Sequence, residues 1–79
     1  MKEEIQQLLA DATGRDASDF SDTTEDLYGD GLLDSMATVG FLLSLQDKYG
    51  IQVPVSEFDR SQWNTIDKIV DRVKELQNE

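Results

Sequence analysis

The sequence predicts an all-α fold, a four-helix bundle with a long first loop and a short third helix. Three segments carry apolar residues at the spacing of one helix face, and glycines or capping residues stand near their ends. A chain of 79 residues has room for one hydrophobic core. Residues 1–79 are therefore expected to form a single domain.

The first helix is predicted from one apolar stripe and a glycine. The stripe follows the i, i+3, i+4, i+7 pattern and consists of Ile5, Leu8, Leu9 and Ala12. Gly14 is placed to end this helix, because glycine accepts the left-handed backbone of a C-terminal cap. Residues 15–34 then form a long acidic connection. We expect its apolar members Phe20, Leu27 and Tyr28 to fix it onto the core.

A second helix is expected from Ser35 to Tyr49, with Ser35 as its N-cap and Gly50 as its stop. At about 100° per residue, one side of this helix is apolar and wide enough to face the core. That side consists of Thr38, Phe41, Leu42, Leu45 and Tyr49.

The second helix also carries another apolar stripe, made of Met36, Val39 and Leu43, within about a quarter turn of Ser35. One interpretation is that this stripe packs under the long loop. A helix of a small domain cannot easily bury two faces, so we expect an exposed patch on which partner proteins dock. The only charged residues of the helix, Asp47 and Lys48, cancel each other.

The C-terminal part is expected to contain the two remaining helices. Residues 51–55 are predicted to be extended and closed by Pro54. Ser56, with Asp59 three residues later, resembles a capping box for the short third helix. Asn64 or Thr65 caps the last helix. The apolar stripe of that helix is Ile66, Ile69, Val70, Val73 and Leu76.

Composition excludes several classes of function. Seven Lys and Arg against seventeen Asp and Glu give 7 − 17 = −10, which disfavours nucleic acids and anionic membranes as partners and favours a soluble monomer. The chain has no cysteine and no histidine, so it lacks a thiolate nucleophile and an imidazole base. A calcium loop starting at Asp26 is rejected, because Tyr28 and Ala37 occupy two of its ligand positions. With neither a signal peptide nor a membrane span in sight, a cytoplasmic location is expected.

Ser35 is the candidate site for chemistry. A serine at a helix start is most often only a cap. The free amides and positive dipole end of the helix would, however, stabilise a phosphodiester attached to the same oxygen. Asp34 offers a carboxylate to a basic residue of a modifying enzyme.

The chain resembles the acyl carrier protein family over essentially its whole length. Asp34-Ser35-Met36 and the helix after it are similar to the Asp-Ser-Leu attachment motif of that family. The closer resemblance is to the D-alanyl carrier proteins of teichoic acid modification in the Gram-positive cell envelope. It rests on three stretches: Gly31-Leu32-Leu33-Asp34-Ser35-Met36, Thr38-Val39, and Pro54-Val55-Ser56-Glu57-Phe58-Asp59-Arg60 with Trp63 and Thr65.

This resemblance implies a carrier protein rather than an enzyme. Ser35 would receive 4'-phosphopantetheine from coenzyme A, and the arm would hold D-alanine as a thioester for delivery to lipoteichoic or teichoic acid. Implied partners are a phosphopantetheinyl transferase, a D-alanine ligase and a membrane acyltransferase that works at the inner face of the membrane. Asp34, Met36, Val39 and Leu43 would contact them, with Val55 as a further candidate.

Two alternatives stay open from the sequence. The chain could be an acyl or aminoacyl carrier of a fatty acid, polyketide or peptide pathway, although the neutral second helix argues against fatty acid synthesis. It could instead be an acidic helical adaptor that docks a partner without any covalent modification.

Overall fold

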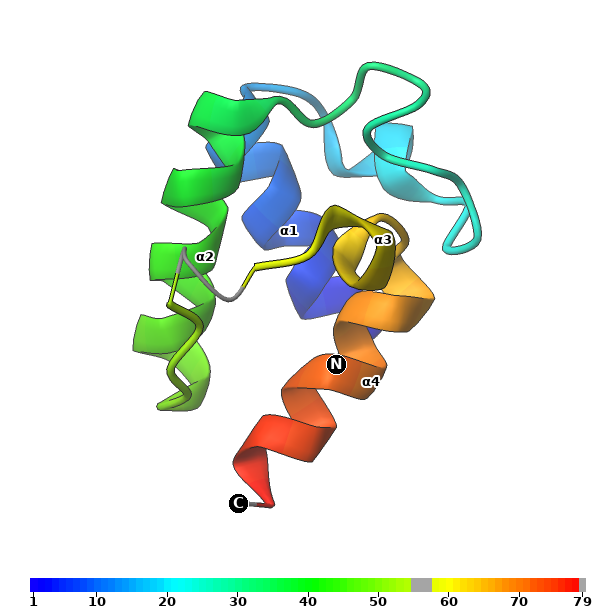
Figure 1. The fold of residues 1–79 in the computed structure, drawn as a ribbon. Helices are drawn as coiled ribbons and strands as arrows, with labels where there is room; N and C mark the ends of the chain where they lie inside the picture. Colours follow the sequence, from blue (N-terminus) through cyan, green and yellow to red (C-terminus); the bar gives the residue numbers. More distant parts are fainter. Residues whose placement is uncertain (55–57, 79) are drawn as a thin grey trace.

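The structure, a computed structural model, describes residues 1–54 and 58–78 and has the all-α fold that the sequence predicts. The described part contains α1 (Lys2–Thr13), the 3₁₀ helix η1 (Ala17–Phe20), α2 (Ser35–Tyr49), α3 (Arg60–Trp63) and α4 (Ile66–Gln77) (Figure 1). The long first loop and the short third helix are confirmed. The 3₁₀ turn inside the loop is an addition to the prediction.

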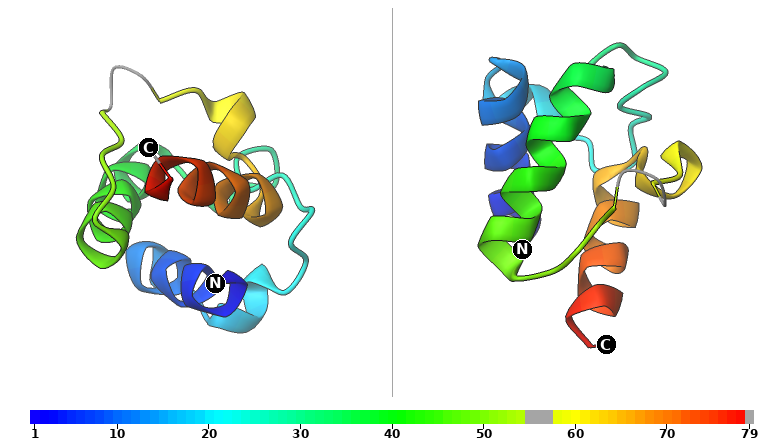
Figure 2. Two further views of the ribbon diagram at one scale, coloured as in Figure 1. Left: turned by 90° about the horizontal axis from the view of Figure 1, so that it is seen from below. Right: turned by 60° about the vertical axis from the view of Figure 1, so that its left-hand side comes forward.

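Helices α1, α2 and α4 lie next to one another in the end-on view of Figure 2. Their buried side chains contribute to one hydrophobic core. Each helix contributes the apolar side that its sequence pattern predicts. In α1, Ile5 and Leu9 are fully buried, whereas Leu8 and Ala12 are half-buried and pack at the edge of the core. Ala10 is buried as well, outside the expected stripe. The buried residues of α4 are Ile66, Ile69, Val70 and Val73, with Leu76 half-buried.

The long loop is attached to the core and to the start of α4. Phe20 and Leu27 are completely buried, which confirms their role as anchors, while Tyr28 is half-buried. The Leu27 N–H donates to the Asn64 carbonyl at 2.7 Å, and the Asp67 N–H donates to the loop carbonyl at residue 23 at 3.0 Å. A loop held by both side chains and backbone is a fixed part of the fold.

The helix ends follow from local chemistry. Gly14 and Gly50 have φ of 74° and 65°, the left-handed conformation that only glycine adopts freely, and they end α1 and α2 as predicted. Of the two residues proposed to cap α4, Thr65 does so: its Oγ1 accepts the Lys68 N–H at 3.1 Å.

The predicted capping box of the third helix is wrong. α3 begins at Arg60, and Asp59 is its N-cap instead of the third residue inside the helix. The Asp59 Oδ1 accepts the Ser61 N–H at 3.0 Å and the Ser61 hydroxyl at 2.8 Å. These hydrogen bonds lower the pKa of Asp59 and favour this tight local cap. Ser56 lies outside the described residues.

Candidate functional site

The start of α2 differs from the prediction in one important detail. The N-cap is Asp34, not Ser35: its carboxylate accepts the Ala37 N–H at 2.8 Å, and its backbone is extended. Both residues are good N-caps, and capping by Asp34 lengthens the helix by one residue and places a charged acceptor at its positive end. Ser35 therefore becomes the first helical residue, and its exposed hydroxyl is not used for capping.

The Ser35 hydroxyl instead contacts Arg60. The Arg60 Nη2 donates to Ser35 Oγ at 2.7 Å, joining residues that lie 25 positions apart in the chain. The guanidinium also lies over the Tyr28 ring, 4.8 Å from its centroid. Phe58 contacts the Tyr28 ring edge-on and the Trp63 ring at a tilt, with centroid distances of 6.4 and 5.8 Å. An aromatic cluster thus supports the cation next to the serine.

A hydrogen-bond chain fixes the loop to the same helix start. The Thr38 hydroxyl donates to the Asp34 carbonyl at 2.6 Å and lies 2.7 Å from the Tyr28 hydroxyl. Since the proton of Thr38 is already used, Tyr28 is the donor of the second bond. Burial raises the pKa of Tyr28, against a smaller lowering effect from the Arg60 cation, so the phenol stays protonated at neutral pH.

The second apolar stripe of α2 is exposed, as predicted. Met36, Val39 and Leu43 have 87%, 44% and 60% of their surfaces accessible. On the other side of the helix, Thr38, Phe41, Leu42 and Leu45 are buried and Tyr49 is half-buried. The alternative in which the stripe packs under the loop is therefore wrong. Val55, the further candidate for partner binding, lies outside the described residues.

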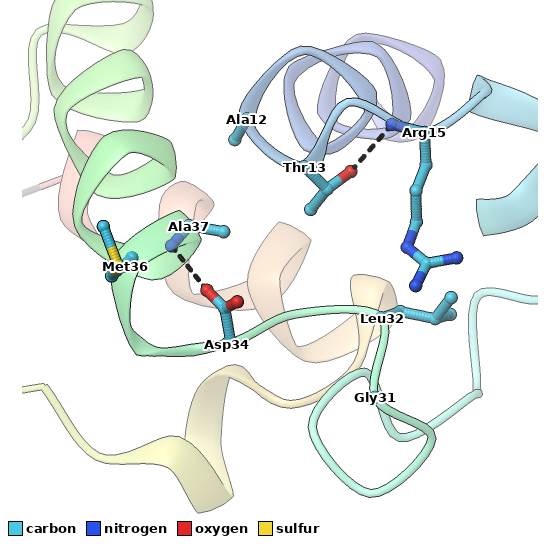
Figure 3. Close-up of a pocket in the computed structure, with 8 residues that line it drawn as sticks. All are labelled: Ala12, Thr13, Arg15, Gly31, Leu32, Asp34, Met36 and Ala37. Carbon is cyan, nitrogen blue, oxygen red and sulfur yellow. Dashed lines mark hydrogen bonds between the residues drawn. The ribbon is translucent and has the colours of Figure 1, made fainter.

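Two surface clefts flank the start of α2. One has a volume of about 480 Å³; Figure 3 shows its lining, with the Asp34 carboxylate turned to the Ala37 amide and Arg15 extended toward Leu32. The other, of about 220 Å³, contains the serine itself. It is lined by Ser35, Thr38, Val39, Leu42, Phe58 and Arg60.

The structure brings together most of the residues that the sequence indicates. Asp34, Ser35, Met36 and Val39 lie within the first turns of one helix, and Leu43 continues the exposed stripe. Sequence reasoning missed the contact of Arg60 with Ser35. Arg60 belongs to a stretch that carries the family resemblance, but no local pattern relates it to a serine 25 positions away.

None of the helices in the described residues has the length and apolar character needed to cross a membrane. A small helical domain with an exposed serine at a helix start, next to a cation and an apolar surface, is the arrangement of a carrier domain.

Comparison with known proteins identifies the family. Residues 3–73 match the family described as "Phosphopantetheine attachment site". The chain is 51% identical over its full length to a D-alanyl carrier protein of Lactobacillus delbrueckii subsp. bulgaricus, covering 96% of that protein. It is 51% identical to the D-alanyl carrier protein of Lactobacillus helveticus, over 99% of this chain and 96% of the relative.

A third relative, the D-alanyl carrier protein of Leuconostoc mesenteroides subsp. mesenteroides, is 50% identical over 96% of this chain and 95% of its own length. The chain belongs to the phosphopantetheine attachment family, within the group of the D-alanyl carrier proteins. It is thus a carrier protein, the cofactor of its family is covalently attached 4'-phosphopantetheine, and a carrier works with enzyme partners.

Proposed function

We propose that Ser35 carries the phosphopantetheine arm and that the single domain of residues 1–79 holds D-alanine on it as a thioester, for D-alanylation of teichoic acids. The observation that supports this most is the state of the Ser35 hydroxyl. It is exposed at the first turn of α2 and, because Asp34 caps the helix, it is not needed for the fold.

The residues around Ser35 fit a phosphodiester. The guanidinium of Arg60 already contacts the oxygen that would be esterified, and the helix start favours negative charge. Attachment would form a bond between Ser35 Oγ and phosphorus, break the pyrophosphate linkage of coenzyme A, release its nucleotide half and pass the hydroxyl proton to a base of the transferase. The arm supplies the thiol that a chain without cysteine lacks.

The enzymes that we propose as partners are a phosphopantetheinyl transferase, a D-alanine ligase and a membrane acyltransferase. The transferase must reach Ser35 itself, and the ligase and the acyltransferase must reach the end of an arm that starts there. All three would therefore meet the exposed stripe of Met36, Val39 and Leu43 beside Ser35. Asp34 lies at the same helix start, with its carboxylate exposed. We propose that the protein acts as a monomer in the cytoplasm, at the inner face of the membrane.

The attachment site is tested with Ser35→Ala. The variant should fold, because the capping hydrogen bond belongs to Asp34, and it should gain no mass when incubated with coenzyme A and a transferase. Ser44→Ala is the matched control, since Ser44 lies on the same helix and its hydroxyl donates to the Gly40 carbonyl at 3.1 Å. Intact mass and peptide mapping measure the adduct. Uptake of the arm by Ser35→Ala would show that the site is wrong.

The cargo is tested with the modified protein and purified ligases. D-alanine should be loaded in preference to L-alanine by a D-alanine ligase, and the product should be released by hydroxylamine as expected for a thioester. Loading by a fatty acyl ligase alone would favour the other carrier pathways. An adaptor would gain no arm in its native host, which the intact mass of the native protein would reveal.

A further inference from the structure

Arg60 is held in place from two sides at the first residue of α3. Its guanidinium donates to Ser35 Oγ at 2.7 Å and lies 4.8 Å from the centre of the Tyr28 ring. Tyr28 is itself fixed through its hydroxyl to Thr38 of α2. The side chain therefore bridges α3, the long loop and the start of α2. These two contacts hold the guanidinium beside the Ser35 oxygen.

The net charge of the domain gives a reason for a cation beside Ser35. The chain carries a net charge of −10, and three of its seven cations, Lys2, Lys48 and Arg72, form ion pairs with carboxylates elsewhere on the surface. Attachment of a phosphodiester adds one more negative charge at Ser35, next to the Asp34 carboxylate. In so acidic a domain, a cation beside the new charge is favourable.

We propose that Arg60 clamps the phosphodiester of the attached arm and so fixes the direction in which the arm leaves Ser35. This inference rests on the proposed attachment at Ser35. A guanidinium suits the role because its fork of donors can bind two oxygens of one phosphate.

The cleft beside Arg60 indicates the direction in which the arm would leave Ser35. It has a volume of about 220 Å³, and its walls include Val39, Leu42 and Phe58 next to Ser35 and Arg60. The first carbons of pantetheine after the phosphate form a branched apolar unit, which suits these walls. With its phosphate held by Arg60, the arm would start along α2 past Val39, at the edge of the exposed stripe, where a docked enzyme would meet it.

The experiment is a double-mutant cycle on the full chain. Melting temperatures are measured for the unmodified and modified forms of wild type and Arg60→Gln, at low and high salt. Modification should change the melting temperature more favourably in wild type than in Arg60→Gln. The two changes should differ by about 2–5 °C, the size expected for a partly exposed ion pair in a domain of this length. The difference should shrink between 0.1 and 1 M salt, where the Debye length falls from about 10 to about 3 Å.

A second measurement reports on the phosphate itself. The phosphorus NMR signal of the modified protein should shift between wild type and Arg60→Gln, whereas the signal of a flexible phosphodiester should not depend on residue 60. Arg60→Lys should lie between the two, because it keeps the charge and loses the fork. Arg15→Gln is the matched control, since Arg15 lines the other cleft beside the helix start and its removal changes the net charge equally.

The outcomes separate the two proposals. The clamp would be overturned if modification changed the melting temperature equally in wild type and Arg60→Gln and the phosphorus signal stayed the same. With the arm mapped to Ser35, the attachment site would still stand. An equal effect of Arg15→Gln would also overturn it, because general electrostatics would then suffice. If the arm maps to another residue, the proposed function fails, and the clamp fails with it.

Discussion

Helices α2 and α4 bury similar numbers of side chains but differ on the side that faces solvent. Each contributes four residues to the buried set, among them Leu45 of α2 and Ile69 of α4. The outer side of α4 is charged and includes Lys68, Asp71 and Lys74. The outer side of α2 instead presents Met36, Val39 and Leu43.

The difference distinguishes a helix whose apolar side chains only complete the core from one that also exposes apolar side chains to solvent. A helix with one apolar stripe and a charged outer side is sufficient to complete a core, and α4 has this pattern. Much of the surface of the exposed side chains of α2 is still in water after folding, so they contribute little to stability. Their place beside Ser35 fits the proposal that a partner covers them.

Replacing a valine by aspartate in each helix should give the largest difference in stability between the two variants. Val70→Asp in α4 buries an unpaired carboxylate in the core and should unfold the domain at room temperature, because the cost of that burial approaches the whole stability of so small a protein. Val39→Asp in α2 should leave the melting temperature within a few degrees of wild type and sharply reduce loading by the ligase. Circular dichroism and a loading assay measure the two effects.

Two results would contradict this contrast. If Val39→Asp unfolds the domain, the stripe supports the fold and the comparison of the helices fails. If it folds and is loaded normally, the enzymes dock elsewhere, and the segment around Val55 and α3 becomes the next surface to mutate.

A smaller contrast is expected within α2 itself. Leu45 is fully buried and Leu43, two residues before it, is 60% exposed. Leu45→Ala should cost about 2–5 kcal/mol of unfolding free energy through the cavity that it leaves. Leu43→Ala should change that free energy by less than about 0.5 kcal/mol. Urea denaturation measures both, and equal losses would mean that Leu43 packs against the core.

The N-caps offer a third comparison of the two helices. Asp34 caps α2 and Thr65 caps α4, each through one side-chain hydrogen bond to an amide. Removing either with alanine should cost about 1 kcal/mol. Only Asp34→Ala should also slow attachment of the arm, since Asp34 lies beside Ser35. Slow attachment in Thr65→Ala would indicate that loss of stability alone impairs the reaction.

The smallest expected effect is on how the melting temperature depends on acidic pH. Hydrogen bonds from Lys2 and from Thr23 lower the pKa of Asp67 in α4 below its usual 3.8. A lowered pKa in the folded state contributes stability above pH 3.8 that is lost as the pH falls through the folded value. Asp67→Asn should therefore melt slightly lower than wild type at pH 7, with the gap closing as the pH falls below 3.8 and through the folded pKa of Asp67. Asp71→Asn, on the outer side of the same helix, is the control.

Local patterns were sufficient for most of the fold. The apolar spacing in α2 predicted both its buried and its exposed side, because helix geometry alone decides which residues share a face. The glycines at the ends of α1 and α2 were equally informative. The cap of α2 was predicted one residue too late, since Asp34 and Ser35 are both good caps and only the backbone angles decide between them.

Contacts between distant segments could not be predicted from the sequence. The bond between Arg60 and Ser35 depends on how the loop, α3 and α2 meet, and no periodicity encodes that arrangement. The 3₁₀ turn η1 was missed for a related reason. It is too short to show an apolar period, and its end is fixed from α1 by a bond from the Gln6 side chain to the Phe20 carbonyl at 2.8 Å.

The attachment of the long loop to the start of α4 has a consequence for the order of folding. The bonds of Leu27 to Asn64 and of Asp67 to the loop carbonyl at residue 23 join segments some 40 positions apart. Helices form from neighbouring residues within about a microsecond, whereas such distant contacts must wait until a long stretch of chain has closed. The surroundings of Ser35 should therefore be completed last during folding. A transferase that needs this finished surface would act only on chains that have already folded.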